Sequence, residues 1–179
     1  MRGAMIETER LVLRPWRDAD RDPFAALNAD PKVMEHFPRT LSRAESDAFV
    51  DRHAVLIEDR GWGLWAVEVK DGPDFIGFTG LAEPVIDTDF VPCVEVGWRL
   101  AAGHWGSGCA PEAAAAALAH GFDELDLTEV VSFTWVGNHN SRRVMEKIGL
   151  DERFEFDHPN LPGHRLERHV LYSLTANDR

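Results

Sequence analysis

Hydrophobic and polar residues recur with different periods along the chain, and each period predicts a different element. Residues 94–100 alternate apolar side chains with other residues, which is the period-2 pattern of a β-strand. Residues 111–125 are dominated by alanine and leucine, and Pro111 suits the first turn of a helix. Between them, residues 104–110 include two glycines and further small side chains. The succession predicts a strand, a tight loop and a long helix.

The rest of the chain carries the same two kinds of pattern. Strand patterns also cover residues 5–16, 62–69, 75–85, 129–136, 153–156 and 166–174. Helical patterns cover residues 18–28, 30–37, 42–60 and 138–148, the third opened by a Ser42–Glu45 capping box and ended by Gly61. A turn at residues 71–73 predicts a hairpin, and the segment 94–136 predicts a strand–helix–strand crossover.

These elements predict an α/β (α+β) fold built on one sheet. We expect a single mixed, mostly antiparallel sheet of about seven strands, with helices on both of its faces. No repeat or linker divides the chain, so residues 1–179 are expected to form one domain.

Composition and charge narrow the class of function. The chain has 19 Lys and Arg against 31 Asp and Glu, a formal net charge of −12. A nucleic-acid binder needs a basic face, so nucleic acid is not expected as a partner. The acidity is compatible with a cationic substrate, although acidity more often serves solubility alone. Cys93 and Cys109 lack metal-ligand spacing, so we expect free thiols and no metal site.

The chain also lacks the patterns of membrane and exported proteins. No apolar run approaches the length of a membrane span, and the N-terminal residues lack the apolar region of a secretory signal. We therefore expect a cytoplasmic protein without a membrane partner.

The loop before the alanine-rich helix has the chemistry of an anion site. Gly106 and Gly108 allow several backbone N–H groups to surround an anion, and the helix dipole favours negative charge there. The loop has neither the Gly-Lys-Ser/Thr of a Walker A loop nor a GxGxxG fingerprint. The structural alternative is a tight turn that only packs the strand against the helix. We expect a ligand that carries phosphates.

Two runs of sequence carry a resemblance to a known family. EVGWRLAAGHWGSGCAPEA, at residues 95–113, and NHNSRRVMEKIGL, at residues 138–150, resemble the acyl-CoA-binding core of the GNAT superfamily of N-acetyltransferases. IETERLVLRPWRDAD and WGLWAVE are similar to the branch of ribosomal-protein N-terminal acetyltransferases, so the resemblance covers nearly the whole chain. It implies the GNAT fold with a splayed central strand pair, acetyl-CoA as the acetyl donor and CoA as a product.

The resemblance also implies a set of cofactor-binding residues. The family motif Gln/Arg-x-x-Gly-x-Gly/Ala falls on Trp105, Gly106, Ser107, Gly108, Cys109 and Ala110, whose backbone would grip the pyrophosphate. The main chain around Trp98, Arg99 and Leu100 would pair with the pantetheine arm. Asn138 would contact the cofactor, and Arg143 belongs to a basic group with Arg142 and Lys147 that suits its phosphates. A solvated helix face is the alternative for these basic residues.

The catalytic candidates follow from the chemistry of amine acetylation. An ammonium acceptor must lose a proton before its nitrogen can attack a thioester. Glu95 is our candidate for the base, because it interrupts an apolar strand and the family often has a glutamate there. Its structural alternative is a pair with an arginine. Weaker candidates for the base are Glu83, Asp87, His158 and His169.

The second catalytic candidate is a proton donor to the departing thiolate. Ser141 takes this role in our interpretation, because Met145 occupies the position of the family's tyrosine. Helix capping is the structural alternative for both Asn138 and Ser141. An acetylated Cys109 is an alternative to direct attack.

The sequence predicts an N-acetyltransferase that works by direct attack in a ternary complex. The acceptor is expected to be a peptide or protein N-terminus, or else a small cationic amine, for which the acidic residues Glu35, Asp87 and Asp89 are suited. Two alternatives stay open: a non-catalytic acyl-CoA-binding or regulatory domain, and a nucleotide-binding protein that uses the same loop. The oligomeric state is also open, a homodimer included.

Overall fold

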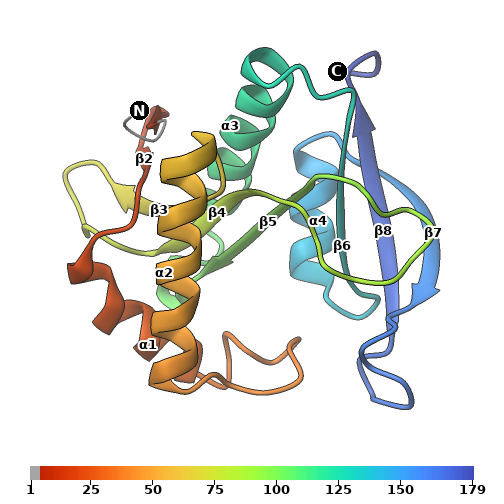
Figure 1. Ribbon diagram of the computed structural model, residues 1–179, viewed down its shortest axis with the longest axis horizontal. Coiled ribbons are helices and arrows are strands. Elements are labelled where there is room, and N and C mark those ends of the chain that lie inside the picture. Colours follow the sequence, from red (N-terminus) through yellow and green to blue (C-terminus); the bar gives the residue numbers. More distant parts are fainter. Residues whose placement is uncertain (1–4) are drawn as a thin grey trace.

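The computed structural model describes residues 5–179, and its strands form one mixed sheet (Figure 1). The order of the eight strands across the sheet is β1-β2-β3-β4-β5-β6-β8-β7. The strands are β1 Ile6–Glu7, β2 Leu11–Arg14, β3 Leu64–Val69, β4 Gly77–Ala82, β5 Glu95–Leu100, β6 Glu129–Trp135, β7 Asp151–Asp157 and β8 Arg168–Thr175. The helices are η1 Asp18–Asp20, α1 Arg21–Ala29, α2 Arg43–Arg60, η2 Ala102–His104, α3 Cys109–Glu124 and α4 His139–Lys147.

The predicted fold class is confirmed, with one strand more than expected. Residues 5–16 form two strands instead of one, because the chain turns between β1 and β2. The Thr8 backbone N–H donates to the Leu11 carbonyl (2.9 Å), and the Leu11 N–H donates to the Thr8 hydroxyl (2.9 Å). β1 therefore folds back antiparallel on β2.

The helix expected over residues 30–37 is absent from the structure, which has turns there. The Asp30 carboxylate accepts the Lys32 N–H (2.9 Å) as a helix N-cap does, and the Met34 N–H donates to the Asp30 carbonyl (3.0 Å). This first turn is not continued as a helix, because the Phe37 N–H donates only three residues back, to the Met34 carbonyl (3.0 Å). The segment instead forms an irregular loop. Its residues His36 and Phe37 contact Trp135 of β6 and Arg99 of β5.

Two helix boundaries show how the sequence sets local structure. At α2 the predicted capping box is present, with Ser42 and Glu45 each accepting the other's backbone N–H, and Gly61 ends the helix at φ 81°. At α3 the helix begins at Cys109, two residues before the expected Pro111. Proline is tolerated there because the first four N–H groups of a helix have no intrahelical acceptor.

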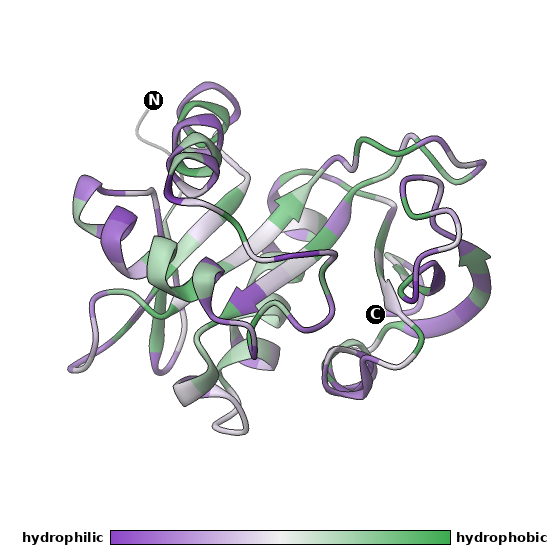
Figure 2. Ribbon diagram, turned by 90° about the horizontal axis from the view of Figure 1, so that it is seen from below, coloured by the Kyte–Doolittle hydropathy of each residue, from purple (hydrophilic) through white to green (hydrophobic). Residues whose placement is uncertain are grey.

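The helices cover both faces of the sheet. Phe78 of β4 packs against Phe24 of α1 (6.0 Å between ring centroids) and Phe49 of α2 (5.1 Å). Leu81 lies three residues after Phe78 on the same strand, so its side chain points to the opposite face of the sheet, where it contacts Gly121 of α3. α4 contacts α3 and β6. Hydrophobic colouring runs along the central strands between these layers (Figure 2).

A buried ion pair joins β2 to η1, the short helix that follows it. Arg14 and Asp20 are each 2% exposed and form two hydrogen bonds of 2.8 Å. Arg14 also donates to Glu68 of β3 (2.7 Å). Each buried charge is thus compensated, as a buried charge must be to avoid a large desolvation cost.

The central pair of strands separates after a single residue pair. β5 pairs antiparallel with β4 along all its residues, but it pairs parallel with β6 only through Glu95 and Val131. The Val131 N–H donates to the Val94 carbonyl (2.9 Å), and beyond this bond the two strands diverge (Figure 1). The predicted splayed pair is therefore confirmed. Among residues 5–179, no helix is long and apolar enough to cross a membrane.

Candidate active site

The glycine-rich loop lies at the carboxyl end of β5 and leads directly into α3. Gly106 has φ 75° and Gly108 has φ 85°, a left-handed region that favours glycine. The Ser107 hydroxyl donates to the His104 carbonyl (2.6 Å) and so closes the turn. Cys109 is the first residue of α3. The unpaired N–H groups of this first turn therefore meet the loop, which is the arrangement that binds phosphate.

Trp105 braces this loop. Its indole Nε1 donates to the Leu100 carbonyl (2.8 Å), so its single N–H is already used. The side chain is 40% exposed, and the Lys32 ammonium lies 5.6 Å from its ring centroid. Trp105 thus supports the turn, and the backbone of the following residues is left to face an anion.

Arg10 is a residue of this region that the sequence analysis missed. It donates from Nη1 to the Ser107 carbonyl (2.9 Å) and pairs with Glu112 of α3 through Nη2 (2.6 Å). Arg10 lies in the turn between β1 and β2, so no local pattern connects it with a loop almost a hundred residues later. It brings a cation to a motif whose usual Gln/Arg position holds Trp105.

Asn138 and Ser141 lie together at the start of α4. The Asn138 Oδ1 accepts the Ser141 N–H (3.2 Å), and its Nδ2 donates to the Thr134 hydroxyl (2.9 Å) and the Ser141 hydroxyl (3.1 Å). The capping alternative is therefore present in the structure. Because the Ser141 oxygen accepts from Asn138, its own proton stays available for donation.

The basic residues of α4 divide into two kinds. Arg142 is engaged within the protein, by the Tyr172 hydroxyl (3.1 Å), the Val136 carbonyl (2.9 Å) and Glu152 (3.0 Å). Arg143 and Lys147 are exposed and form no ion pair with any described residue. Of this group, Arg143 and Lys147 are the ones free to meet an anionic ligand.

Glu95 lies where β5 and β6 separate. In a regular parallel ladder, the bond after Val131 N–H to Val94 O would join the Phe133 N–H to the next β5 carbonyl. That ladder bond is absent, and the Phe133 N–H instead favours the charged form of the Glu95 carboxylate. Burial raises the pKa of Glu95 to about 8, and the Phe133 N–H opposes this rise. No ion pair joins Glu95 to an arginine in the described part of the chain.

The weaker candidates for the base are placed differently. Glu83 is exposed and paired with Arg60 (2.7 Å). His158 and His169 lie against each other with tilted rings (4.8 Å between centroids, 54° between planes), and burial lowers the pKa of both. Cys109 is buried at the other end of β5 from Glu95, with its sulfur 3.3 Å from the Ser107 hydroxyl oxygen. The structure does not bring that thiol to the carboxylate.

Two loops meet above the separated strands. Arg165 donates from Nη2 to the Glu35 carbonyl (2.9 Å), which joins the loop before β8 to the loop before α2. The His36 ring lies 5.4 Å from that of Trp135 on β6. Phe37 lies against Arg99 of β5, 4.2 Å from its guanidinium. Residues 35–37 thus form part of a roof over the face that carries Glu95.

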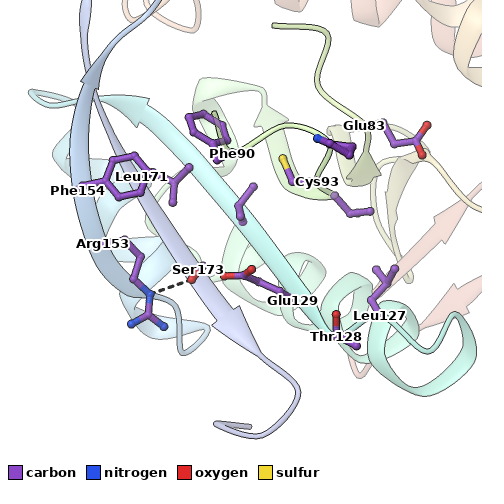
Figure 3. A pocket seen from close by; sticks show the side chains of 13 residues that line it. Glu83, Phe90, Cys93, Leu127, Thr128, Glu129, Arg153, Phe154, Leu171 and Ser173 are labelled. Atoms are coloured by element: carbon purple, nitrogen blue, oxygen red, sulfur yellow. Dashed lines mark hydrogen bonds between the residues drawn. The ribbon is translucent and has the colours of Figure 1, made fainter. Parts of the chain in front are cut away.

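A cavity of about 720 Å³ opens beside this region, at the start of β6 (Figure 3). The loop between β4 and β5 forms one side of it, and strands β6, β7 and β8 form the other. Its lining includes Val94 and Val131, the neighbours that join the two strands. Phe90, Phe154 and Leu171 gather at one end, while Arg153 is held by Ser173 (2.8 Å).

Comparison with known proteins identifies the family of this arrangement. Residues 10–151 match the family model described as an acetyltransferase (GNAT) domain. The chain belongs to the GNAT acetyltransferase family. Acetyl-CoA-dependent acyl transfer is therefore its class of activity, and the GNAT fold binds acetyl-CoA or CoA.

Individual relatives agree with this assignment. The chain is 33% identical over 146 residues to YkkB of Bacillus subtilis (strain 168), covering 81% of this chain and 84% of YkkB. It is 32% identical over 184 residues to the FsC-acetyl coenzyme A-N(2)-transacetylase of Aspergillus fumigatus, covering 97% and 77% of the two chains. A Bacillus anthracis GNAT acetyltransferase superposes with a TM-score of 0.81 at 24% identity, covering 96% and 98%. The narrower expectation of a ribosomal-protein branch stays a prediction.

The described part of this GNAT protein has no cluster of candidate metal ligands. Among residues 5–179, no group of three or more His, Cys, Asp and Glu side chains is placed to hold a metal ion.

Proposed function

We propose that this GNAT protein is an N-acetyltransferase that transfers the acetyl group of acetyl-CoA to a primary amine, by direct attack in a ternary complex. The amine belongs to a small molecule or to a peptide N-terminus. The observation that carries the proposal is the position of Glu95. Its carboxylate, with a pKa of about 8, stands at the separation of β5 and β6, on the strand that runs to the phosphate-binding loop.

The residues around the gap fit acetyl-CoA. The first turn of α3 and the loop of Gly106 and Gly108 offer backbone N–H groups to the pyrophosphate. Beyond Glu95, the edge of β5 that faces β6 lacks a strand partner, so its main chain can pair with the amides of pantetheine. Arg143 and Lys147 of α4 are free to meet the remaining phosphate.

Each catalytic residue then has a defined task. Glu95 accepts the proton of the acceptor ammonium, and a base whose pKa lies near the working pH serves this purpose best. The amine nitrogen forms a bond to the thioester carbonyl carbon, and the carbon–sulfur bond breaks. Ser141 donates its proton to the departing sulfur, while Asn138 holds the hydroxyl in place, and the second proton lost by the attacking nitrogen returns to the Ser141 oxygen. The products are an N-acetylated amine and CoA.

Two measurements test this proposal together. Calorimetric titration with acetyl-CoA and with ATP establishes which ligand the loop accepts, and we expect binding of acetyl-CoA alone. Thiol release from acetyl-CoA is then followed with N-terminal peptides, polyamines and other amines. Binding of acetyl-CoA without acetylation of any amine would favour a non-catalytic acyl-CoA-binding domain. Competition by ATP would favour a nucleotide-binding protein.

A further inference from the structure

Arg99 lies on the same face of β5 as Glu95, with Gly97 between them. Residues 95, 97 and 99 share a face because side chains alternate along a strand. A Cβ atom added at Gly97 would meet nothing within 4 Å. This face of β5 therefore presents a carboxylate, an open stretch and a guanidinium in line, below the roof formed by residues 35–37.

The guanidinium of Arg99 is held rigidly on one side. Its Nη1 donates to the Asn28 Oδ1 (2.7 Å), and Asn28, which is fully buried, donates in turn to the Ser46 hydroxyl (3.0 Å). Phe37 and Phe78 lie 4.2 and 5.4 Å from the guanidinium carbon. These contacts fix the plane of the group, since aromatic faces attract cations.

The other side of the guanidinium has no partner among the described residues. The Nε atom is buried without a hydrogen bond, and no hydrogen bond is formed by Nη2. No carboxylate of residues 5–179 forms an ion pair with Arg99, and burial lowers the pKa of its guanidinium to about 10. The side chain as a whole is only half-buried, so part of it stays accessible to a ligand.

Arg14 shows how this chain treats a buried guanidinium whose role is structural. Arg14 has two carboxylate partners, Asp20 and Glu68, and both bonds are short (2.8 and 2.7 Å). Arg99 is less buried as a whole but has a buried Nε, and it contacts an amide and two aromatic rings but no negative charge. A buried cation without a counter-charge is unfavourable unless a ligand supplies one.

We propose that Arg99 binds a carboxylate of the acceptor, whose amine lies at Glu95. The inference rests on the proposed function, because it assigns the other end of the same acceptor site. The Nε–Nη2 edge offers two parallel N–H donors, which match the two oxygens of a carboxylate. A single guanidinium in a chain of net charge −12 suits a monovalent carboxylate better than a phosphate dianion.

The spacing of the two residues sets the length of the acceptor. Residues 95 and 99 are four positions apart on one strand, so their Cα atoms are separated by roughly 13 Å. Both side chains reach into this interval and shorten it. The acceptor is therefore an amino acid in the broad sense, with an extended chain of several atoms between amine and carboxylate, which passes over Gly97.

The test compares matched acceptors that differ only in charge. Straight-chain ω-amino acids of about four to eight carbons, bracketing the interval set by the strand rise, are each assayed beside their carboxamide by thiol release. For at least one length, the wild type should show a kcat/KM for the acid roughly tenfold or more above that of the amide, as expected for charge-assisted bonds. Arg99→Gln should remove this preference by slowing the acids and not the amides. Arg99→Lys should keep part of it.

The control variant is Arg52→Gln. Arg52 is an exposed arginine of α2 that also lies over a phenylalanine ring, 5.6 Å from Phe49, and forms no ion pair with the described residues. It should keep both the activity and the acid preference of the wild type. Circular dichroism and a thermal melt of each variant establish that Arg99→Gln is folded.

The outcomes separate this inference from the proposed function. Equal rates for acids and amides in the wild type, or a preference that survives Arg99→Gln, would overturn the carboxylate site while leaving the acetyltransferase intact. If no amine of either kind is acetylated, calorimetry of the acids and amides with the CoA complex decides. Selective binding of acids that is lost in Arg99→Gln supports the site, and equal or absent binding overturns it. Failure to bind acetyl-CoA counts against the proposed function.

Discussion

At the point where β5 and β6 separate, the backbone N–H of Phe133 on β6 favours the charged form of the Glu95 carboxylate on β5. Burial of the carboxylate acts in the opposite direction and is the larger effect. The ionisation of the proposed base therefore depends on both strands.

Replacement of Glu95 by glutamine should slow turnover about 100-fold or more, the usual contribution of a positioned base. Glutamine keeps the size of the side chain and an acceptor oxygen, so the affinity for acetyl-CoA should change less than about twofold. Thiol release and calorimetry measure the two quantities. Glu83→Gln, which removes a carboxylate exposed and paired with Arg60, should behave like the wild type. Turnover that is unaffected in Glu95→Gln would place the base elsewhere.

The pH–rate profile should report the same group. Because Glu95 must be ionised to accept a proton and its pKa is about 8, kcat/KM for the acceptor should rise with pH and level off above about pH 8. In Glu95→Gln the residual kcat/KM should no longer show this rise with pH. A wild-type profile already flat from pH 6 would contradict the assignment. The profile should be measured with an acceptor whose amine does not titrate in this pH range, so that the titration of Glu95 is not confused with that of the acceptor.

Stability should depend on pH in the opposite direction. The folded pKa of Glu95, about 8, lies above its ordinary value of 4.5, so folding favours the protonated form. The unfolded chain ionises first as pH rises, and the stabilisation is lost between about pH 4.5 and 8, by an amount of roughly 4 kcal/mol. Urea unfolding at pH 5 and pH 8.5 tests this. The free energy of unfolding of Glu95→Gln should rise relative to that of the wild type between pH 5 and pH 8.5. The same difference between the two proteins at both pH values would count against the raised pKa.

The loop glycines should matter for affinity as well as for stability. Gly108→Ala places a Cβ at φ 85° and 3.1 Å from the Arg10 Nη2, so we expect weaker acetyl-CoA binding, by about fivefold or more, together with a loss of roughly 1 kcal/mol. Gly149→Ala is the matched control, since it has φ 88° with nothing within 4 Å of the added carbon. It should lose similar stability and keep its affinity. Equal affinities in the two variants would argue against the loop as the phosphate site.

The buried Arg14–Asp20 pair should be the most sensitive charged contact for stability. Asp20→Asn leaves a guanidinium that is 2% exposed without its main counter-charge, and should cost about 3 kcal/mol in urea unfolding. Glu155→Gln breaks the exposed pair with Arg168, whose side chains are 47% and 48% exposed, and should cost less than about 1 kcal/mol. Neither change should alter acetyl-CoA affinity. A loss for Asp20→Asn no larger than that for Glu155→Gln would contradict this interpretation.

Local signals in the sequence predicted most of the fold. The capping box of Ser42 and Glu45 and the stop at Gly61 gave the bounds of α2 nearly to the residue, because caps act within one turn. The helix expected over residues 30–37 was wrong, because the turn that begins at Asp30 is not continued and the apolar residues belong to a loop instead. Hydrophobic spacing alone does not show whether a first turn is continued.

The site was predicted where it rests on consecutive residues and missed where it rests on distant ones. The loop of Gly106 and Gly108 and the cap of Asn138 and Ser141 are contiguous motifs. The partnership of Arg10 with Ser107 joins parts of the chain that only the sheet brings together. Arg99 was expected to serve the cofactor through its main chain, and nothing in the sequence links its side chain to Asn28, 71 residues away.

The single residue pair between β5 and β6 divides the sheet into two blocks, β1–β5 and β6–β8–β7. A ligand whose amides bond to the free edge of β5 would lie between the two blocks like a short strand and connect them. Each round of acetyl transfer ends with the dissociation of CoA, and this connection is then lost. The enzyme would be most open to heat and proteases between turnovers, so a cell rich in acetyl-CoA would also preserve more of the protein.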